Sequence, residues 1–502
     1  MTPVMQNLRE MELAREAYWL KYPATSPVKL RWRALAVRHS FHLLPGEHIL
    51  ELGAGSGLWT KHLLKVTRGE NPITAAVCNS GLLPPSDQRH AQFVLVNSLG
   101  DLPEQSFDYV IGTAILSHNE CAQNLRQLYR LLKPGGQLLF FEANFWNPQV
   151  ALKNAFPWIG RRMGNARCQI ALRKYRFMKV ASQQGFTEID VIPYDIVHPR
   201  TPKVLVHRLQ FLAFIAEHAP FVKELCGTLY IRARKPGGAT SRSFVSLACH
   251  SAFFDAVSFV VPCHNEEMNI PRLVEGILGF YGRYVHEIVL INDNSADSTE
   301  DVAQDIASRE PRVKIINRNP PNGVGRALRE GYAAATGRYI LTMDCDFVHI
   351  LPEFRDLFDA VAAGHEGAIG SRFTHESVMI NYPFLKILCN RSFHLMVNLV
   401  LRQRVRDISN NLKLYRADIL KNIDIEQDHF AANAETGLKP LLAGYDIQEV
   451  PISWINRTLE MGSSSFRIVN VAPSYFQALL EMLAKIRRQR RTITHTKQKP
   501  VQ

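Results

Sequence analysis

The sequence predicts an α/β protein of two domains, each built around a mostly parallel sheet. At 502 residues, the chain is too long for one ordinary hydrophobic core. Short apolar runs alternate with helical patterns in both halves, which is typical of strands and helices in turn. The stretch KPGGATSRS at 235–243 separates the two series and is small, polar and turn-rich, as linkers are. We expect domains at 1–235 and 253–470, a linker at 236–252, and an amphipathic helix with a basic tail at 471–502.

The first domain is expected to begin its sheet with the strand HILEL at 48–52. This strand runs into the loop GAGSG at 53–57, and a helix is expected from Leu58. Glycines let the backbone turn sharply there and let its amides approach a ligand at the start of the helix. Further strands are expected at 73–77, 107–111 and 137–141, the last after a turn at 133–136.

Three of these segments, ELGAGSG, SFDYVIG and LLKPGGQLLFFEAN, resemble class I S-adenosylmethionine-dependent methyltransferases, over residues 43–234. The resemblance implies a Rossmann-like sheet that binds S-adenosylmethionine (SAM). The residues implied for that site are Glu51, Gly53, Gly55, Gly57, Asn79, Asn97 and Ser98.

The chain departs from this family at two places. The second strand ends in CNS at 78–80, where the family usually has Asp or Glu for the ribose, and Asn97-Ser98 stand where an adenine-contacting Asp is common. Amide and hydroxyl side chains can also form hydrogen bonds with the ribose and the adenine, but they carry no charge. The domain is therefore either an active methyltransferase or a scaffold that keeps the fold.

The methyl acceptor is not readable from the sequence, although two features lie where the family builds its acceptor site. His118 is either a substrate-side histidine or a histidine in a surface turn. The basic stretch at 161–176 either holds an anionic acceptor or solvates a helix.

The second domain is expected to have strands at 257–261, 287–291, 312–317 and 339–343, with helices between them. Such alternation gathers the polar strand ends at one edge of a parallel sheet. The last of these strands delivers Asp344 and Asp346, which are two residues apart and so point the same way on an extended chain. Both carboxylates can then reach one divalent cation, Mg²⁺ or Mn²⁺, which would bridge to a substrate diphosphate.

The segments VPCHNEE at 261–267, INDNSADST at 291–299, NGVGRA at 322–327 and MDCDF at 343–347 resemble glycosyltransferase family 2, whose core is the GT-A fold. The resemblance implies that Asp344 and Asp346 serve the metal and the diphosphate of a nucleotide sugar. It also implies that the nucleotide is bound by Pro262, Asn265, Glu266 and Asp293.

Within that family, IGSRF at 369–373, VRDISNNLKLYR at 405–416 and EVPISWINR at 449–457 resemble polyprenyl-phosphate hexosyltransferases of the dolichol-phosphate mannose synthase type. This implies GDP-mannose or a UDP-sugar as donor and a polyprenyl phosphate as acceptor. Arg372, Arg391 and Arg457 are the arginines implied for phosphate binding, because an arginine fork suits phosphate geometry. The residues ISNN at 408–411 replace the family's common Thr/Ser-Gly-Phe, which leaves the acceptor open.

The acceptor decides what the chemistry requires. A lipid phosphate is already an anion, so direct displacement with inversion needs no strong base. A hydroxyl acceptor needs a carboxylate to take its proton, and Asp407 is then the first choice and Glu435 the second.

The formal net charge of +13 predicts an anionic partner, and no nucleic-acid motif accompanies it. Residues 380–401 carry apolar residues at helical spacing with cationic flanks, which fits either a helix on a membrane surface or core packing. The basic run KIRRQRR at 485–491 is either part of a membrane-binding helix or a solvated tail. No signal-peptide pattern and no run of eighteen uncharged apolar residues is present, so we expect a cytoplasmic location, with the inner face of the membrane as the place of peripheral contact.

The sequence as a whole indicates a bifunctional enzyme. Its second half is a metal-dependent, inverting glycosyltransferase, and its first half is a SAM-dependent methyltransferase of the same pathway. The alternative is a glycosyltransferase to a soluble hydroxyl acceptor, with a methyltransferase-like domain that binds but does not catalyse.

Overall fold

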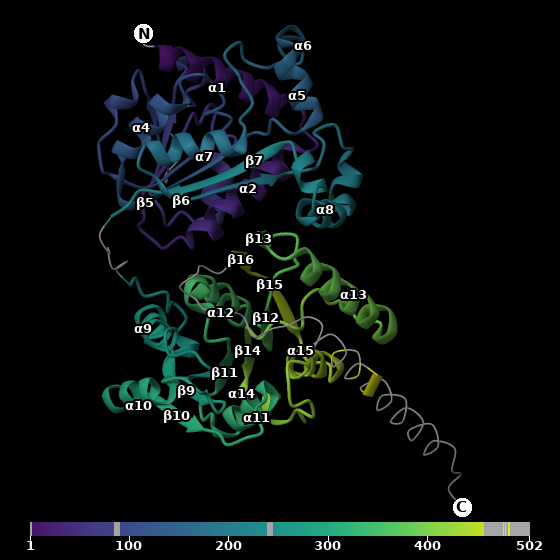
Figure 1. Cartoon of the computed structure of the whole chain (residues 1–502). Helices are drawn as coiled ribbons and strands as arrows, with labels where there is room; N and C mark the ends of the chain where they lie inside the picture. The colour runs from purple at the N-terminus through teal and green to yellow at the C-terminus, as the bar shows by residue number, and fades with distance from the viewer. Residues whose placement is uncertain are drawn as a thin grey trace, which may run out of the picture. The chain divides into compact units, whose positions relative to one another are not determined.

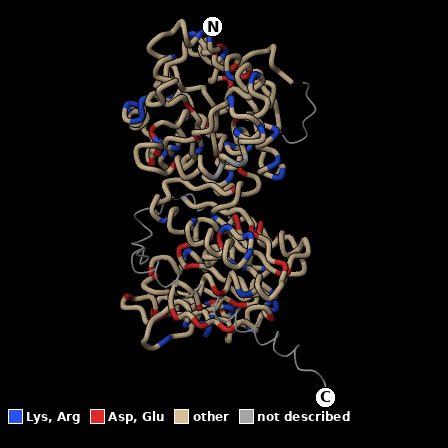
Figure 2. Tube along the Cα trace, turned by 90° about the vertical axis from the view of Figure 1, so that its right-hand side faces the viewer, with Lys and Arg blue, Asp and Glu red and all other residues tan. Residues whose placement is uncertain are grey.

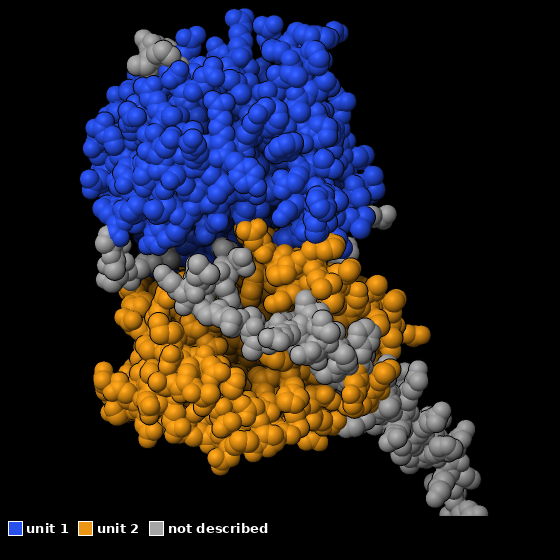
Figure 3. All heavy atoms as spheres, viewed as in Figure 1, with its two compact units in different colours: residues 1–243 blue, residues 244–502 orange. Residues whose placement is uncertain are grey.

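The computed structural model describes residues 3–84, 91–237 and 244–455, together with 475, 477, 480 and 481. The chain divides into two compact units, 1–243 and 244–502, shown in two colours in Figure 3. The division falls inside the predicted linker. Arg457, the basic run at 485–491 and most of the predicted C-terminal helix lie outside the described residues.

Unit 1 is built around a seven-stranded sheet with the order β3-β2-β1-β4-β5-β7-β6. The first five strands in this order are parallel, and β7 is antiparallel to both of its neighbours. The chain order turns back between β1 and β4, which is the switch point where such sheets bind ligands. The strands are β1 (Ile49–Leu52), β2 (Ile73–Val77), β3 (Ala91–Leu95), β4 (Phe107–Thr113), β5 (Leu132–Ala143), β6 (Thr187–Tyr194) and β7 (Thr228–Arg234).

Helices cover this sheet in Figure 1. Strands β1 and β2 are buried along their whole length, as expected for central parallel strands. The core packs buried residues of these strands against α4, α7 and the start of α1. The helices are α1 (Pro3–Lys21), α2 (Ser26–Phe41), α3 (Thr60–Val66), α4 (Cys121–Leu131), α5 (Pro148–Ala155), α6 (Pro157–Arg162), α7 (Lys174–Gln183) and α8 (Lys203–His218), with short 3-10 turns η1 (Ser80–Leu82) and η2 (Leu99–Asp101).

Unit 2 has its own seven-stranded sheet, ordered β10-β9-β8-β11-β14-β12-β15, and a small sheet of β13 and β16. Strands β8 to β11 are parallel, and β14 is antiparallel to β11 and to β12. The strands are β8 (Val257–Cys263), β9 (Val285–Asn292), β10 (Val313–Asn317), β11 (Tyr339–Thr342), β12 (Gly367–Ser371), β13 (Val378–Ile380), β14 (Lys413–Arg416), β15 (Ile447–Pro451) and β16 (Ser453–Ile455).

The second core joins α11, α13 and α15 to this sheet. Unit 2 contains the helices α9 (Ile270–Tyr281), α10 (Thr299–Arg309), α11 (Val324–Ala334), α12 (Arg355–Ala362), α13 (Phe384–Leu401), α14 (Ala417–Lys421) and α15 (Ala432–Leu442), and the 3-10 segment η5 (Phe347–Phe354). Among the described residues, α13 alone is long and apolar enough to cross a membrane, by length and composition.

The predicted fold class is confirmed, because two α/β sheets follow one another along the chain. The predicted turn at 133–136 is wrong: these residues belong to β5, where the register against β4 shifts from Phe107↔Leu132 to Tyr109↔Gln137. The extra residues form a bulge, and Gly135 takes the positive φ of 79° that it requires. Figure 2 shows Lys and Arg interspersed with Asp and Glu along both units, so net charge by itself marks no site.

Candidate functional site

A cavity of about 520 Å³ lies at the carboxyl ends of β8, β9 and β11. Its position follows from the sheet, because parallel strands end together at one edge. Helix α13 and the segment 409–411 close its other sides. Six of the residues predicted for the nucleotide-sugar and acceptor sites line it: Pro262, Glu266, Asp293, Asp344, Asp346 and Arg372.

The two carboxylates predicted for the metal both line this cavity. Asp344 follows the end of β11, and its Oδ1 accepts a hydrogen bond from Asn411 Nδ2 at 2.8 Å. Asp346 precedes the 3-10 segment η5 and is 9% exposed. Two carboxylates on one wall of an open cavity are hard oxygen ligands, so this donor set fits Mg²⁺ or Mn²⁺.

Asp293 is the first residue after β9 and is already held by the protein. Its Oδ2 accepts from the Gly323 amide at 2.7 Å, and its Oδ1 pairs with Arg318, which also reaches Glu330. The carboxylate is therefore fixed in position at the cavity wall, with lone pairs left for a base or a ribose.

Asn265 lies outside the lining of the cavity in the described structure. It adopts a left-handed φ of 58°, and its Oδ1 accepts from the Ala296 amide at 2.8 Å. Its own amide donates to Ser295 Oγ at 3.0 Å. Asn265 thus joins the loops after β8 and β9 and supports the site without facing it.

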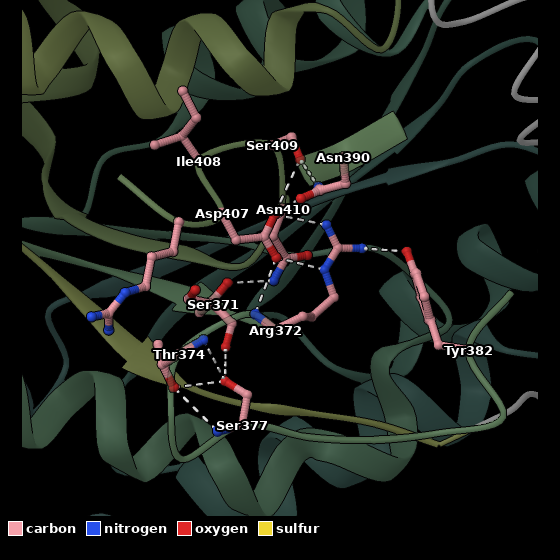
Figure 4. Close-up of polar contacts among 12 residues, drawn as sticks. Ser371, Arg372, Thr374, Ser377, Tyr382, Asn390, Asp407, Ile408, Ser409 and Asn410 are labelled. Carbon is pink, nitrogen blue, oxygen red and sulfur yellow. Dashed lines mark hydrogen bonds and ion pairs between the residues drawn. The ribbon is translucent and has the colours of Figure 1, made fainter. Parts of the chain in front are cut away.

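Arg372 forms a buried ion pair with Asp407 beside the cavity (Figure 4). The guanidinium donates from Nε at 2.7 Å and from Nη2 at 2.9 Å, which is bidentate geometry, and the Arg372 amide donates at 3.0 Å. A third guanidinium nitrogen, Nη1, lies 3.3 Å from Tyr382 Oη. Although burial opposes ionisation, Arg372 holds the pKa of Asp407 well below its usual range.

Neither predicted base lines the cavity among the described residues. Asp407 is 0% exposed and, besides Arg372, accepts from Ser409 Oγ at 3.1 Å. Glu435 is 1% exposed, accepts from the amides of Glu426 and Gln427 at 2.9 and 2.7 Å, and pairs with Lys439. Both carboxylates therefore hold other groups of the protein in position, and neither faces the cavity.

Arg391 also lies outside the cavity lining. Its guanidinium packs over the Phe373 ring at 4.1 Å, and it donates to the backbone oxygen of Arg406. Burial lowers the pKa of Arg391 to about 10. The third predicted arginine, Arg457, lies outside the described residues.

Several lining residues were not predicted. The Oδ1 atoms of Asn411 and Asn433 and the Nε1 of Trp454 are buried without a hydrogen-bond partner among the described residues, so these groups suit a polar ligand. Lys413 is buried nearby and donates to the backbone oxygen of Asn433 at 2.6 Å, and burial lowers the pKa of Lys413 to about 7. The ISNN departure at 408–411 was the available signal for Asn411, and Trp454 lies in the EVPISWINR motif at 449–457, while Asn433 had no signal in the sequence.

In unit 1 the predicted glycine loop connects β1 to α3. Gly53, Gly55 and Gly57 have positive φ values of 68°, 57° and 78°, which explains why glycine is needed at each. Glu51 is buried below the loop, accepts from Thr60 Oγ1 at 2.6 Å, and has its pKa raised to about 7 by burial.

The three polar residues predicted for ribose and adenine have protein partners. Asn79 caps η1 by accepting from the Gly81 amide, and Ser98 caps η2 by accepting from the Gly100 amide. Asn97 Oδ1 accepts from Arg9 Nη2 at 3.0 Å. Side chains of α1 fill the space above the loop, and the cavity left beside it is about 10 Å³. SAM therefore does not fit this cradle as it is folded here.

His118 is neither in a surface turn nor exposed to a substrate. It is 4% exposed, its Nδ1 accepts from the Glu120 amide, and its Nε2 lies 2.7 Å from Asn124 Nδ2. Burial lowers its pKa to about 4, so the ring is neutral.

In the predicted basic stretch, Arg161 and Arg162 are exposed at the end of α6.

Comparison with known families agrees with both resemblances. Residues 258–424 match the model described as glycosyl transferase family 2, and residues 50–140 match the model described as methyltransferase domain. The chain joins a methyltransferase domain to a family 2 glycosyltransferase domain. The matched segments contain Asp344 and Asp346 in one case and the glycine loop in the other.

Individual relatives match the second half. The chain is 28% identical over 230 residues to a polyprenol monophosphomannose synthase of Mycolicibacterium smegmatis, covering 43% of this chain and 83% of the relative. It is 28% identical over 201 residues to a dolichol-phosphate mannosyltransferase of Pyrococcus furiosus, covering 39% of this chain and 56% of the relative. A solved structure of glucosyl-3-phosphoglycerate synthase from Mycobacterium tuberculosis aligns at 18% identity and a TM-score of 0.36, covering 46% and 80%.

Proposed function

We propose that the glycosyltransferase domain transfers a hexose from a nucleotide sugar, GDP-mannose or a UDP-sugar, to a polyprenyl phosphate, with inversion at the anomeric carbon. One observation carries the proposal: Asp344 and Asp346 share a cavity with Arg372. This reaction requires carboxylates to hold the metal that binds the donor's diphosphate. It also requires a cation, here a guanidinium, to bind the acceptor's phosphate. The names of the two relatives support the same donor and acceptor classes.

Asp344 and Asp346 would hold the divalent cation, which when bound offsets negative charge on the departing nucleoside diphosphate. Asn411 fixes the carboxylate of Asp344 through its 2.8 Å hydrogen bond. Arg372 would bind the acceptor phosphate, and Asp407 holds its guanidinium in place with two hydrogen bonds. A lipid phosphate is an anion already, which suits a cavity that neither predicted base lines.

Helix α13 supports a lipid acceptor. Its first part contributes Leu388, Asn390 and Phe393 to the cavity lining. Its other residues include Leu395 at 60% exposed and Leu399 at 70% exposed. Apolar side chains beside the cavity would let the enzyme rest on the inner face of a membrane and receive a polyprenyl chain.

Vesicle sedimentation tests this membrane contact. Leu395→Ser with Leu399→Ser should abolish binding to vesicles of anionic phospholipid, while Met268→Ser, which changes a residue 69% exposed in the same unit, should leave it unchanged. Equal binding of both variants would remove α13 from the proposal.

The transfer reaction is tested with purified protein, Mg²⁺ or Mn²⁺, polyprenyl phosphate and a panel of GDP- and UDP-sugars. We expect a glycolipid in the organic phase and at least about 100-fold less of it from Asp346→Ala, since metal-held charge stabilisation is worth several kcal/mol. Asp301→Ala, an exposed carboxylate of α10, is the matched control. Release of nucleoside diphosphate without a lipid product would favour the alternative, a soluble hydroxyl acceptor.

The pairing of sugar transfer with methyl transfer in one pathway also remains a proposal. Addition of SAM to the glycolipid reaction, followed by mass spectrometry for a 14 Da increase, tests it directly. Unchanged product mass would favour a methyltransferase domain that does not catalyse.

A further inference from the structure

We infer that helix α1 is an intramolecular competitor of SAM: its charged residues occupy the cofactor cradle of the methyltransferase domain, so the cofactor binds only when α1 is displaced. The inference rests on the match of residues 50–140 to a methyltransferase domain. It does not depend on sugar transfer by the other unit.

Glu12 provides the central contact. Its side chain is 0% exposed, and its carboxylate accepts hydrogen bonds from the amides of Gly55 at 3.0 Å, Cys78 at 3.0 Å and Asn79 at 2.7 Å. Converging backbone amides of this kind form a site for an anion. The family's usual acidic residue is missing from the end of β2, and the carboxylate from α1 stands at that strand end in its place.

Neighbouring residues of α1 extend the contact along the whole predicted site. Arg9 donates to Asn97 on the side predicted for adenine. Arg15 donates to the backbone oxygens of Gly53 and Thr113, and Ser56 Oγ donates to Glu16, at the glycine loop. From Arg9 to Glu16 the helix advances roughly 10 Å, at 1.5 Å per residue.

The glycine loop therefore has no room for a ligand while α1 is in place. A Cβ built on Gly55 would lie 2.6 Å from Glu16 Oε2, and one built on Gly53 would lie 3.1 Å from Arg15 Nη1. The glycines leave open the space that a cofactor needs, and α1 fills it.

Two observations argue that this closed state is not the only use of the cradle. Trp59 Nε1 and Thr113 Oγ1 line the 10 Å³ remnant and are buried without a hydrogen-bond partner among the described residues. Burial of Glu12, Arg15 and Glu16 also costs desolvation energy, and it raises the pKa of Glu12.

Apolar packing opposes the displacement of α1, because Val4, Met5 and Leu8 pack into the core. A ligand that competes with α1 must therefore displace the helix, and the free energy of that displacement weakens the apparent affinity of the ligand.

Calorimetric titration of the full chain with S-adenosylhomocysteine tests the competition, with no nucleotide sugar present. Glu12→Ala should bind at least about tenfold more tightly than wild type, because the three amides are released. Glu10→Ala changes another carboxylate of α1, outside the described contacts with the loop, and should match wild type. If Glu12→Ala does not fold, Glu16→Ala, which removes the contact with Ser56, takes its place with the same expected direction.

Hydrogen exchange provides the second readout. Saturating S-adenosylhomocysteine should increase exchange in residues 3–21 of the wild type, since the helix leaves the cradle. Tight wild-type binding with unchanged protection of α1 would overturn the inference, as would variants that fold but bind no more tightly. If the variants fold but bind no more tightly, α1 occupies the cradle permanently and the domain does not bind the cofactor. Sugar transfer is not part of either measurement, so its failure and the failure of this inference can be told apart.

Discussion

Asp407 and Arg372 show how a residue found from sequence can have a different role in the folded chain. Asp407 was predicted as the base for a hydroxyl acceptor, and it is the fully buried member of an ion pair whose other member, Arg372, reaches the cavity. Buried pairs of this kind add little net stability compared with apolar residues, but they are costly to break because one charge is left unpaired. Asp407 is therefore best described as a positioning residue for Arg372.

Asp407→Asn should reduce the stability of unit 2 by roughly 3–5 kcal/mol and abolish sugar transfer, because Arg372 loses its partner. Combining it with Arg372→Met should restore stability but not transfer. Chemical denaturation and product formation measure the two effects. A stable Asp407→Asn variant that is inactive would instead support Asp407 as a base.

The pH dependence provides an independent check. The folded-state pKa of Asp407 is depressed from the ordinary value of 3.8, so its contribution to stability is fully present above that value and is lost only as pH falls further through the folded pKa. Between pH 5 and 9, the transfer rate should therefore show no step due to Asp407. A step in this range that Asp407→Asn removes would contradict its assignment as a positioning residue.

Asn411 supports the predicted metal site through Asp344. Asn411→Ala should raise the Mg²⁺ or Mn²⁺ concentration needed for half-maximal transfer by about tenfold, because one hydrogen bond to a charged group is worth about 1.5–3 kcal/mol. Asn410→Ala is the matched control, since that side chain donates to the Gly370 oxygen. If both variants need the same Mg²⁺ or Mn²⁺ concentration for half-maximal transfer, Asn411 does not contribute to metal binding.

Helix α11 shows how a motif can depend on packing between elements. The NGVGRA motif begins this helix, and a Cβ on Gly325 would lie 2.0 Å from the backbone oxygen of Gln427. The Gly325 amide also donates to the Asp428 oxygen at 2.9 Å, and Arg326 pairs with the Asp428 carboxylate. These contacts join the start of α11 to the segment before α15.

Gly325→Ala should therefore destabilise unit 2 by about 1–3 kcal/mol, as expected for overpacking against backbone. Gly364→Ser is a control of a different kind, because no atom lies within 4 Å of its Cβ position and only its positive φ of 113° opposes a side chain. Thermal denaturation with circular dichroism measures both. An undisturbed Gly325→Ala variant would show that the two segments separate easily.

The whole chain consists of two units with separate sheets and separate cores. Each site uses groups from its own unit: the Asp344 cavity is lined by unit 2, and the α1 contacts with the glycine loop are internal to unit 1. Ligands for one unit should then stabilise that unit alone.

Differential scanning calorimetry of the full chain should show two transitions. GDP or UDP with Mg²⁺ at about 100 times its Kd should raise one of them by roughly 5–10 °C, from a binding contribution of about 2.7 kcal/mol. The other transition should not move. A single transition that shifts as a whole would indicate that the two units unfold together.

The sequence by itself determined four of the seven strands in each large sheet, their order along the chain, and the residues at the ends of those strands. These depend on local apolar runs and on glycines with positive φ, which are properties of short segments. Asp344 and Asp346 were predicted from the end of one strand, whereas Pro262, Glu266, Asp293 and Arg372 were implied by the family resemblance, and the structure places all six at one cavity.

Only the tertiary structure decided which of these groups face a ligand. Asp407 and Glu435 turn to buried partners, and Asn411, Asn433 and Trp454 reach the cavity from segments far apart in the chain. Glu12 lies 43 residues from Gly55, yet its carboxylate binds that amide. Such contacts depend on how whole elements pack, and the periodicity of a segment carries no information about its distant neighbours.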